Sequence, residues 1–344
     1  MTSMSQESSG SLPALPEESL RASKLMSAKE AVSRFVEDGD SVFLGYTSWA
    51  AGLEREIARQ RKRELTAIAT VGSLMLPLAG CANKLITAYA LGAGSPWFME
   101  RYQAGEIQIE DYTNQTVAMM FMAGALGIPF IPTRSFLGSD YLREDFYPQP
   151  GGFLGDQKMK VMESPFEGGE QVVALPAVRP DVSCVHVQWA DEDGNAAFWG
   201  GDGEVRWGLW ASKKIIISAE EIVPRGVLRS DPGRTTVPGL MVDAVVHMPF
   251  GATPWGVAGY YAPDGKLQAE YIGKMRTEAG FGEVMDRWVD GVGDHDGFIA
   301  RHAEVFGAGA LEALRVDQTW EPERPIRYGW RSQPPAASGN GGAE

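Results

Sequence analysis

The sequence predicts an α/β fold in which helices cover an open, parallel or mixed sheet, with a helical segment toward the C-terminal end. Three observations predict it. Short apolar runs, typical of strands buried on both faces, alternate with helix-like segments between residues 25 and 135. Further strand-like runs follow between residues 171 and 251, and residues 268–314 have a mostly helical pattern. Alternation of strands with helices indicates a parallel sheet, because a crossover helix joins each strand to the next.

The first helix is predicted to begin at Ser27. Ser27 and Glu30 have the spacing of a capping box, and an apolar helical face follows before Gly39 ends the helix. Parallel sheets bind ligands at the carboxyl ends of their strands, so we expect a site among the loops that follow the strands. The strands of this half are expected at 41–46, 65–71, 84–90, 107–112 and 128–132, the helices at 52–63, 95–105 and from 116 to about 127, and the strand-end loops at Gly45, Val71, Leu91, Asp111 and Thr133.

Residues 136–170 show little periodicity, and a loop of this length is usually functional or mobile. The segment DEDGN, from Asp191 to Asn195, has the chemistry of a hairpin turn, because Asp-Gly and Asn tolerate a positive φ. The strands of the second half are predicted at 171–178, 181–190, 196–201, 213–223 and 240–251, with a helix allowed near 204–211.

The composition excludes several classes of protein. A net charge of −14 disfavours binding to nucleic acid, whose phosphates it repels. Two cysteines, Cys81 and Cys184, form neither a disulfide framework nor a metal motif, which favours a reduced, cytoplasmic setting. The apolar run 116–132 has only 17 residues and contains glycines and prolines, so a buried helix and a strand are expected rather than a membrane span. The N-terminal residues carry no signal-peptide pattern.

Two histidine clusters raise the question of a metal site. His186 lies in a predicted strand and is expected to be a core residue, because one strand supplies too few ligands. Asp294 to Asp296 with His302 is expected to be a capped helix start rather than a metal site. The segment GAGSPW (Gly92 to Trp97) falls short of a dinucleotide fingerprint. Its backbone N–H groups and Ser95 can meet an anionic or carbonyl group, and a tight strand-to-helix connection that binds nothing is the open alternative. We therefore predict no metal and no bound cofactor.

Four segments, in order and at similar spacing, resemble the alpha subunits of the family I CoA-transferases, and most of all the alpha subunit of glutaconate CoA-transferase. The resemblance runs from about Met26 to Phe306. It implies one CoA-transferase alpha-subunit domain over residues 25–330, with tails at 1–24 and 331–344 that are expected to be disordered. The segments are DGDSVFLGYT, RYQAGEIQIEDYTNQTVAMMFMAGALGIPFIP, DVSCVHVQWADEDGNAAFWGG and GLMVDAVVHMPFGATP.

The resemblance also implies a reaction and a partner. CoA passes between an acyl-CoA and a small carboxylic or dicarboxylic acid, through a glutamyl-CoA thioester in a beta subunit. The nucleophile belongs to a Glu-Ser-Gly or Glu-Asn-Gly motif, and this sequence contains neither. No catalytic residue is therefore expected in this chain, and the site is completed by the beta subunit. Two alternatives stay open: a CoA-thioester hydrolase or ring-opening enzyme of the same fold, and a non-catalytic paralogue that binds CoA esters.

By matching position, the resemblance implies substrate-positioning roles for Gly45, Gly94, Ser95, Asn114, Arg134, Gly138 and Ser139. Ser95 is expected to meet the acyl carbonyl or the substrate carboxylate. The hydrolase branch has a Glu where this chain has Asn114, and because Asn is no general base this difference favours transfer. Arg134 is suited to a substrate carboxylate, with a surface ion pair to Asp140 or Glu144 as the alternative.

The chain departs from the family pattern in two loops of the acyl pocket. Tyr46 replaces an expected glycine, and the GAGSPW loop is shorter. Tyr46, Trp49 and Trp97 suit a larger or flatter acyl group than glutaconyl, although packing in the core or at an interface is the role we favour for them.

Overall fold

The computed structural model describes residues 22–45, 49–72, 74–90, 94–143, 152–155, 157–166, 168–230, 232–233 and 235–316. The predicted tails lie almost entirely outside this part of the chain. Lys24, near the first described residue, bonds to the folded domain. Its ammonium donates hydrogen bonds to the carbonyl oxygens of Gly239 and Val242, both at 2.7 Å.

The first half forms parallel β/α units, as predicted. Ser27 caps the first helix and accepts a hydrogen bond from the N–H of Glu30. The strands pair in chain order, each parallel to the next. The elements are α1 (Ala28–Phe35), β1 (Ser41–Phe43), α2 (Ala51–Arg59), β2 (Leu65–Gly72), α3 (Met75–Leu78), β3 (Ala82–Ala90), α4 (Pro96–Gln103), β4 (Gln108–Asp111) and α5 (Asn114–Ala125).

The second half extends the same sheet on the other side of β1. Strand β8 (Val182–Ala190) pairs parallel with β1, and β10 (Lys214–Ile222) and β11 (Ala244–His247) follow, giving the order β11-β10-β8-β1-β2-β3-β4. The predicted DEDGN hairpin is confirmed, since β9 (Ala196–Ala197) returns antiparallel to β8. The direction of winding reverses between β1 and β8, and such a switch point is where open α/β sheets bind ligands.

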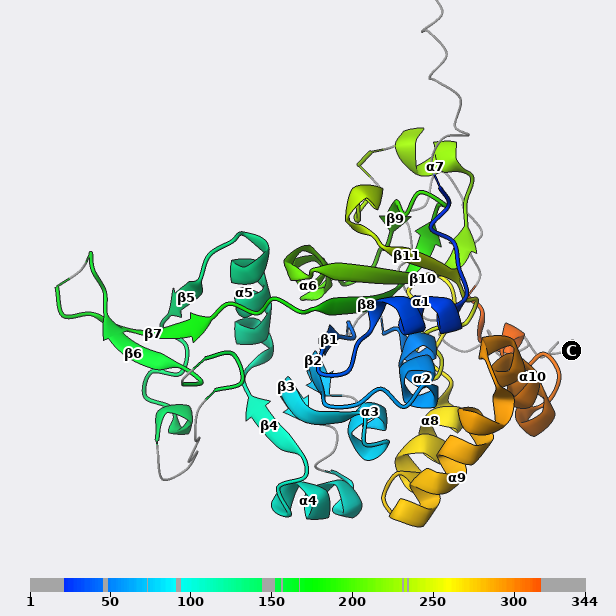
Figure 1. The fold of residues 1–344 in the computed structure, drawn as a ribbon, viewed down its shortest axis with the longest axis horizontal. Coiled ribbons are helices and arrows are strands. Elements are labelled where there is room, and N and C mark those ends of the chain that lie inside the picture. Colours follow the sequence, from blue (N-terminus) through cyan, green and yellow to red (C-terminus); the bar gives the residue numbers. More distant parts are fainter. Residues whose placement is uncertain are drawn as a thin grey trace, which may run out of the picture.

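Helices cover both faces of this sheet. One face packs against α1, α2 and α3, and against the predicted C-terminal helices α8 (Gly265–Lys274), α9 (Glu278–Trp288) and α10 (His295–Phe306). The other face packs against α5 and α6 (Val205–Ala211). A short helix, α7 (Arg225–Ser230), follows β10. In Figure 1, α8, α9 and α10 gather at the lower right, beside α2.

The strand predicted at 128–132 does not belong to the main sheet, which corrects one expectation. Strand β5 (Phe130–Thr133) instead pairs antiparallel with β7 (Gln171–Pro176), which pairs with β6 (Lys160–Glu163). Pro132 has no N–H to donate, so it fits an edge strand, and the alternating, partly exposed residues of β5 do not suit a strand covered on both faces. This small sheet projects away from the body in Figure 1. The loop after Thr133 therefore does not follow a strand of the main sheet, and it was wrongly expected among the strand-end loops of that sheet.

The apolar run 116–132 forms α5 and then β5, as predicted. No helix among the described residues has both the length and the apolar character to cross a membrane.

Candidate active site

A cavity of about 270 Å³ lies where β1, β2 and β3 end. Trp49 follows the carboxyl end of β1, Leu74 follows β2, and Ser95 follows β3. Helix α8 and the segment after β11 complete the walls. The lining residues are Trp49, Ala51, Glu54, Arg55, Leu74, Met75, Gly94, Ser95, Pro254, Trp255, Gln268, Tyr271, Ile272 and Met275.

Two tryptophans form one side of the cavity. The indole rings of Trp49 and Trp255 stack, with centroids 4.9 Å apart and an angle of 19° between the planes. Trp49 is 4% exposed, and its Nε1 donates to the Glu54 carboxylate at 3.1 Å. Trp49 therefore packs in the interior, as favoured, and also lines the cavity. Tyr46 lies outside the described residues, and Trp97 packs against Phe281, 5.5 Å between ring centroids, away from this cavity.

Two buried charged residues of opposite sign lie in the wall formed by α2. Glu54 and Arg55 are 4% and 2% exposed. The Arg55 guanidinium donates to the carbonyl of Thr253 at 2.7 Å and lies 3.8 Å from the ring centroid of Phe298. Burial lowers the pKa of Arg55, and the neighbouring Tyr271 and Glu54 oppose this shift, so the guanidinium stays charged.

Sequence reasoning missed this pair. The segment from Ala51 to Ala58 is rich in Glu and Arg, yet all of it is buried. The one signal in the sequence is that Leu53 and Ile57 lie on the same helical face, next to the two charges. Charged residues are almost never fully buried unless paired, so composition alone pointed to a solvated helix.

Gly94 and Ser95 are the two predicted site residues that line the cavity. Ser95 is 3% exposed and caps α4, because its hydroxyl accepts from the N–H of Phe98 at 3.3 Å. The same hydroxyl donates to the carbonyl of Met275 at 2.7 Å. Its single donor is therefore committed, and a bond from Ser95 to an acyl oxygen would require breaking the link to α8. The substrate role of Ser95 remains a prediction.

Replacing Ser95 with alanine is expected to lower the free energy of unfolding by about 1 kcal/mol, because it removes an N-cap and the bond to Met275. Urea denaturation of wild type and Ser95→Ala measures this. Ser27→Ala, at the exposed cap of α1, is the matched control and is expected to lose less, because it removes a cap alone. A Ser95→Ala protein as stable as wild type would contradict the structural role.

The other glycine and amide positions lie around the same edge of the sheet. Gly45 follows β1 with φ of +52°, a conformation that suits glycine. Asn114 is the first residue of α5, after the Thr113 cap, and its side chain is exposed at the end of β4. Neither lines the cavity. Their substrate roles stay predictions.

The segment that carries Arg134, Gly138 and Ser139 contacts the end of β4 through a side-chain hydrogen bond. The Tyr141 hydroxyl donates to the Asp111 carboxylate at 3.0 Å and so ties this segment to the strand end. Gly138 has φ of +74°, and the Ser139 hydroxyl donates to the carbonyl of Phe136 at 2.7 Å.

Arg134 points toward the small sheet. It forms an ion pair with Glu170, and the expected Asp140 pairs with Arg143. Glu144 lies outside the described residues. A surface ion pair is thus present at Arg134, and its role toward a substrate carboxylate stays a prediction.

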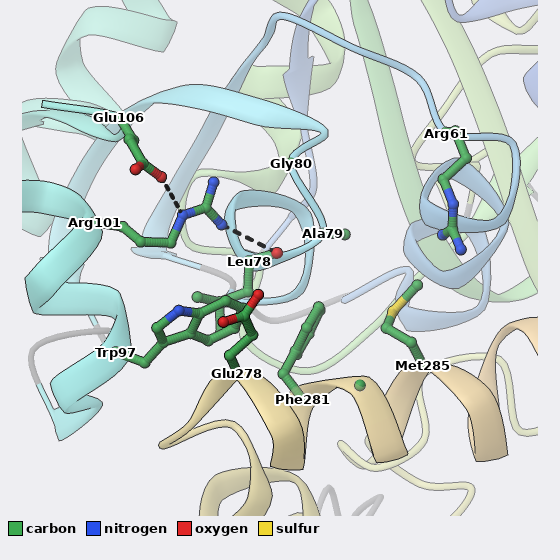
Figure 2. Close-up of a pocket in the computed structure, with 11 residues that line it drawn as sticks. Arg61, Leu78, Ala79, Gly80, Trp97, Arg101, Glu106, Glu278, Phe281 and Met285 are labelled. Atoms are coloured by element: carbon green, nitrogen blue, oxygen red, sulfur yellow. Dashed lines mark hydrogen bonds and ion pairs between the residues drawn. The ribbon is translucent and has the colours of Figure 1, made fainter. Parts of the chain in front are cut away.

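A second hollow, of about 570 Å³, lies between α4, α9 and the turn before β3 (Figure 2). In Figure 2, Arg101 reaches from α4 to Glu106 and to the backbone of Leu78. Gly80 and Glu106 precede β3 and β4, so this hollow lies toward the amino ends of the strands. We therefore take the cavity, rather than this hollow, as the candidate active site.

The two histidine clusters singled out in the sequence have structural roles, as expected. His186 is 1% exposed, and its ring nitrogens bond to Ser218 at 2.9 Å and to Glu220 at 2.7 Å. Asp294 caps α10, and His302 bonds to Asp264 at 2.6 Å. In the described part of the chain, no group of three or more His, Cys, Asp or Glu side chains has the arrangement of a metal site.

His295 is expected to make stability depend on pH. Its Nε2 bonds to the carbonyl of Pro249 at 2.7 Å, and burial, reinforced by the Arg55 charge, lowers its pKa to about 3. The unfolded chain, with a pKa near 6.5, binds the proton first, so this stability is present above about pH 6.5 and is lost as the pH falls toward 3. Between pH 7 and pH 5 the loss is about 2 kcal/mol.

Denaturation of wild type, His295→Gln and His247→Gln at pH 7 and pH 5 measures this contribution. His247 is exposed and serves as the control. We expect the loss to shrink by about 2 kcal/mol in His295→Gln only. An unchanged slope in that variant would show that another group carries the pH dependence.

Comparison with known proteins identifies the family. Residues 25–248 match the model of the coenzyme A transferase family. The A subunit of glutaconate CoA-transferase from Acidaminococcus fermentans is 33% identical over 310 residues, which cover 86% of this chain and 95% of that protein. The crystal structure of that enzyme superposes with a TM-score of 0.78, over 86% of this chain and 96% of the other.

Two further relatives have different activities. The A subunit of 3-oxoadipate CoA-transferase from Pseudomonas knackmussii is 32% identical over 82% of this chain and 99% of that protein. The cholesterol ring-cleaving hydrolase IpdA subunit of Rhodococcus jostii is 28% identical over 73% of this chain and 88% of that protein. The chain belongs to the coenzyme A transferase family.

Proposed function

We propose that this chain is the alpha subunit of a heteromeric CoA-transferase, which exchanges CoA between an acyl-CoA and a carboxylic acid with the help of a beta subunit. The observation that carries the proposal is the near full-length similarity to the corresponding subunits of two CoA-transferases, in a chain without a Glu-Ser-Gly or Glu-Asn-Gly motif. The nucleophilic glutamate is accordingly assigned to the beta subunit.

The reaction consists of paired acyl exchanges. The glutamate carboxylate attacks the thioester carbonyl, which gives an acyl-glutamyl anhydride and releases CoA as a thiolate. The thiolate then attacks the glutamyl carbonyl, which gives the glutamyl-CoA thioester and frees the donor acid. The acceptor carboxylate reverses both steps, and CoA leaves on the new acyl group.

The alpha subunit contributes the cavity and the loops at the carboxyl edge. In this role the Gly94–Ser95 loop lies at the acyl group, and Gly45 and Asn114 lie nearby on the same edge. Asn114 cannot remove a proton from water, which supports transfer over hydrolysis.

Co-expression with the candidate beta subunit tests the proposal. The purified complex is treated with acyl-CoA and then with hydroxylamine or borohydride, and both chains are analysed by mass spectrometry. We expect a trapped mass on one glutamate of the beta subunit, and none when the alpha chain is treated alone. A complex that consumes acyl-CoA without any covalent adduct would instead support the hydrolase function of the IpdA relatives. A complex that neither consumes nor transfers would support a non-catalytic paralogue.

A further inference from the structure

Two residues of the cavity wall carry buried polar atoms that have no hydrogen-bond partner in the described part of the chain. One atom is Nη2 of Arg55, whose Nη1 donates to the carbonyl of Thr253 at 2.7 Å. The other is the hydroxyl of Tyr271. Arg55 lines the cavity from α2 and Tyr271 lines it from α8. Buried polar atoms in native proteins are nearly always hydrogen-bonded, so a ligand or an ordered water is expected beside these two.

The positive charge of Arg55 also has no ion-pair partner among the described residues. The side chain is 2% exposed, and its guanidinium rests against the ring of Phe298, 3.8 Å from the centroid. Glu54 is its neighbour in the wall, but the Glu54 carboxylate accepts from Trp49 and forms no ion pair with Arg55. Charged side chains are almost never fully buried unless they are paired. An anion in the cavity would supply the partner that Arg55 lacks.

The chemistry of the two groups favours a carboxylate. Burial raises the pKa of Tyr271 to about 12, and the neighbouring Arg55 guanidinium opposes this shift, so the hydroxyl keeps its proton at neutral pH and can donate. A planar guanidinium with a hydroxyl beside it matches the two accepting oxygens of a carboxylate. A phosphate would leave further charged oxygens against walls that offer them no donor.

The rest of the cavity suits an apolar body attached to that carboxylate. Trp49 and Trp255 stack into a flat wall, and Leu74, Ile272 and Met275 line the same space. Such walls bind hydrocarbon through burial and ring contacts. An apolar cavity of about 150 Å³ holds one benzene molecule. At about 270 Å³, this cavity has room for a carboxylate together with a chain or ring of several carbons.

We propose that Arg55 and Tyr271 form a carboxylate-binding site, which holds the far carboxylate of the acyl group while the apolar body of that group lies against Trp49 and Trp255. The inference rests on the proposed function, and it assigns the recognition of a half-thioester of a dicarboxylic acid to two residues of this chain. Glu54 lines the same cavity and repels a carboxylate, so the bound carboxylate is confined to the side of Arg55 and Tyr271.

The test uses the co-expressed complex, with succinyl-CoA, glutaryl-CoA and adipyl-CoA as donors and acetate as acceptor. Each donor is compared with the uncharged analogue in which an isopropyl group replaces the far carboxylate. We expect the best dicarboxylic donor to exceed its analogue in kcat/KM by at least about 100-fold, because the analogue leaves a buried guanidinium without its partner. If no dicarboxylic donor exceeds its analogue, the inference is overturned and the proposed function still stands.

Tyr271→Phe tests the site without disturbing the fold. It removes a hydroxyl that has no hydrogen bond to lose within the described residues, so the midpoint of urea denaturation is expected to stay unchanged. We expect the preference for the dicarboxylic donor over its analogue to fall at least about 5-fold. Arg55→Lys keeps the charge but loses the planar fork, and the preference is expected to fall further.

Tyr102→Phe is the matched control, because Tyr102 is 42% exposed and does not line the cavity. This variant is expected to keep the preference of the wild type. If the preference is unchanged in Tyr271→Phe as well, water rather than a substrate carboxylate occupies the space beside the two groups, and the inference is overturned.

Calorimetric titration of the complex with succinate, glutarate and adipate separates failure of the inference from failure of the proposed function. Binding that weakens at least about 5-fold in Tyr271→Phe but not in Tyr102→Phe, in a complex that transfers no CoA, retains the site and rejects the transferase. Binding that does not depend on Tyr271, in a complex that forms the glutamyl adduct, rejects the site and retains the transferase.

Discussion

Replacing Arg55 with methionine is expected to lower the free energy of unfolding by about 3 kcal/mol. The side chain is 2% exposed, so methionine retains most of the packing volume and removes the charge. The Thr253 carbonyl loses its hydrogen bond from Arg55, and the buried Glu54 carboxylate loses the neighbouring positive charge. Leaving one member of a buried charged pair costs more than the pair contributes, because the remaining charge stays out of water. Urea denaturation at pH 7 measures the loss.

Two further variants make this prediction specific. Arg34→Met, on the exposed face of α1, is expected to change stability by less than about 0.5 kcal/mol. Adding Glu54→Gln to Arg55→Met is expected to recover at least about 1 kcal/mol, since the amide still accepts from Trp49 and carries no charge. If the double variant is less stable than Arg55→Met, Glu54 is compensated by other groups and the pair is not a unit.

The same pair explains where sequence reasoning succeeded and where it could not. The apolar runs of β2, β8 and β10 are local signals, and the structure has strands there. The cap at Ser27 and the hairpin at DEDGN are also local and are confirmed. The alternation of strands and helices was enough for the parallel sheet, since crossover connections allow few other arrangements.

Contacts between segments far apart in the chain could not be predicted from local sequence patterns. Strand β5 has a strand-like sequence, but its partner β7 follows about 40 residues later. No pattern in the sequence near β5 indicates that β7 is its partner. The cavity wall also joins α2 to Tyr271 and Ile272 of α8, more than 200 residues further along the chain. Arg55 is buried because α8 covers it. The local sequence does not reveal this contact and indicates only a polar helix.

The switch point and the cavity belong to one arrangement. Strand β1 lies at the centre of the sheet, with β2 on one side and β8 on the other, and the chain leaves it through Gly45 toward the Trp49 wall. Any change that displaces β1 therefore displaces the wall of the cavity. On the opposite face, α6 approaches β1 closely at Gly208.

Gly208→Ala is expected to lower the free energy of unfolding by about 2 kcal/mol. A Cβ atom at this position would lie 2.3 Å from Cε1 of Phe43, which is buried and also packs on Phe121 with ring centroids 4.7 Å apart. The ring has no free side toward which to move, and overpacking of this kind costs about 1–3 kcal/mol. The gain in helix propensity from glycine to alanine, about 1 kcal/mol, opposes this cost without cancelling it.

Gly282→Ala provides a control of opposite sign. It lies inside α9 with no atom within 4 Å of its Cβ position, so only the propensity gain applies and stability is expected to rise by up to about 1 kcal/mol. In the double variant Gly208→Ala with Phe43→Leu, the smaller side chain is expected to remove part of the clash, so the losses add to less than their sum. If the two losses in free energy of unfolding add exactly, the cost of Gly208→Ala does not arise at the Phe43 ring. The contact between α6 and β1 would then not be what fixes the cavity wall.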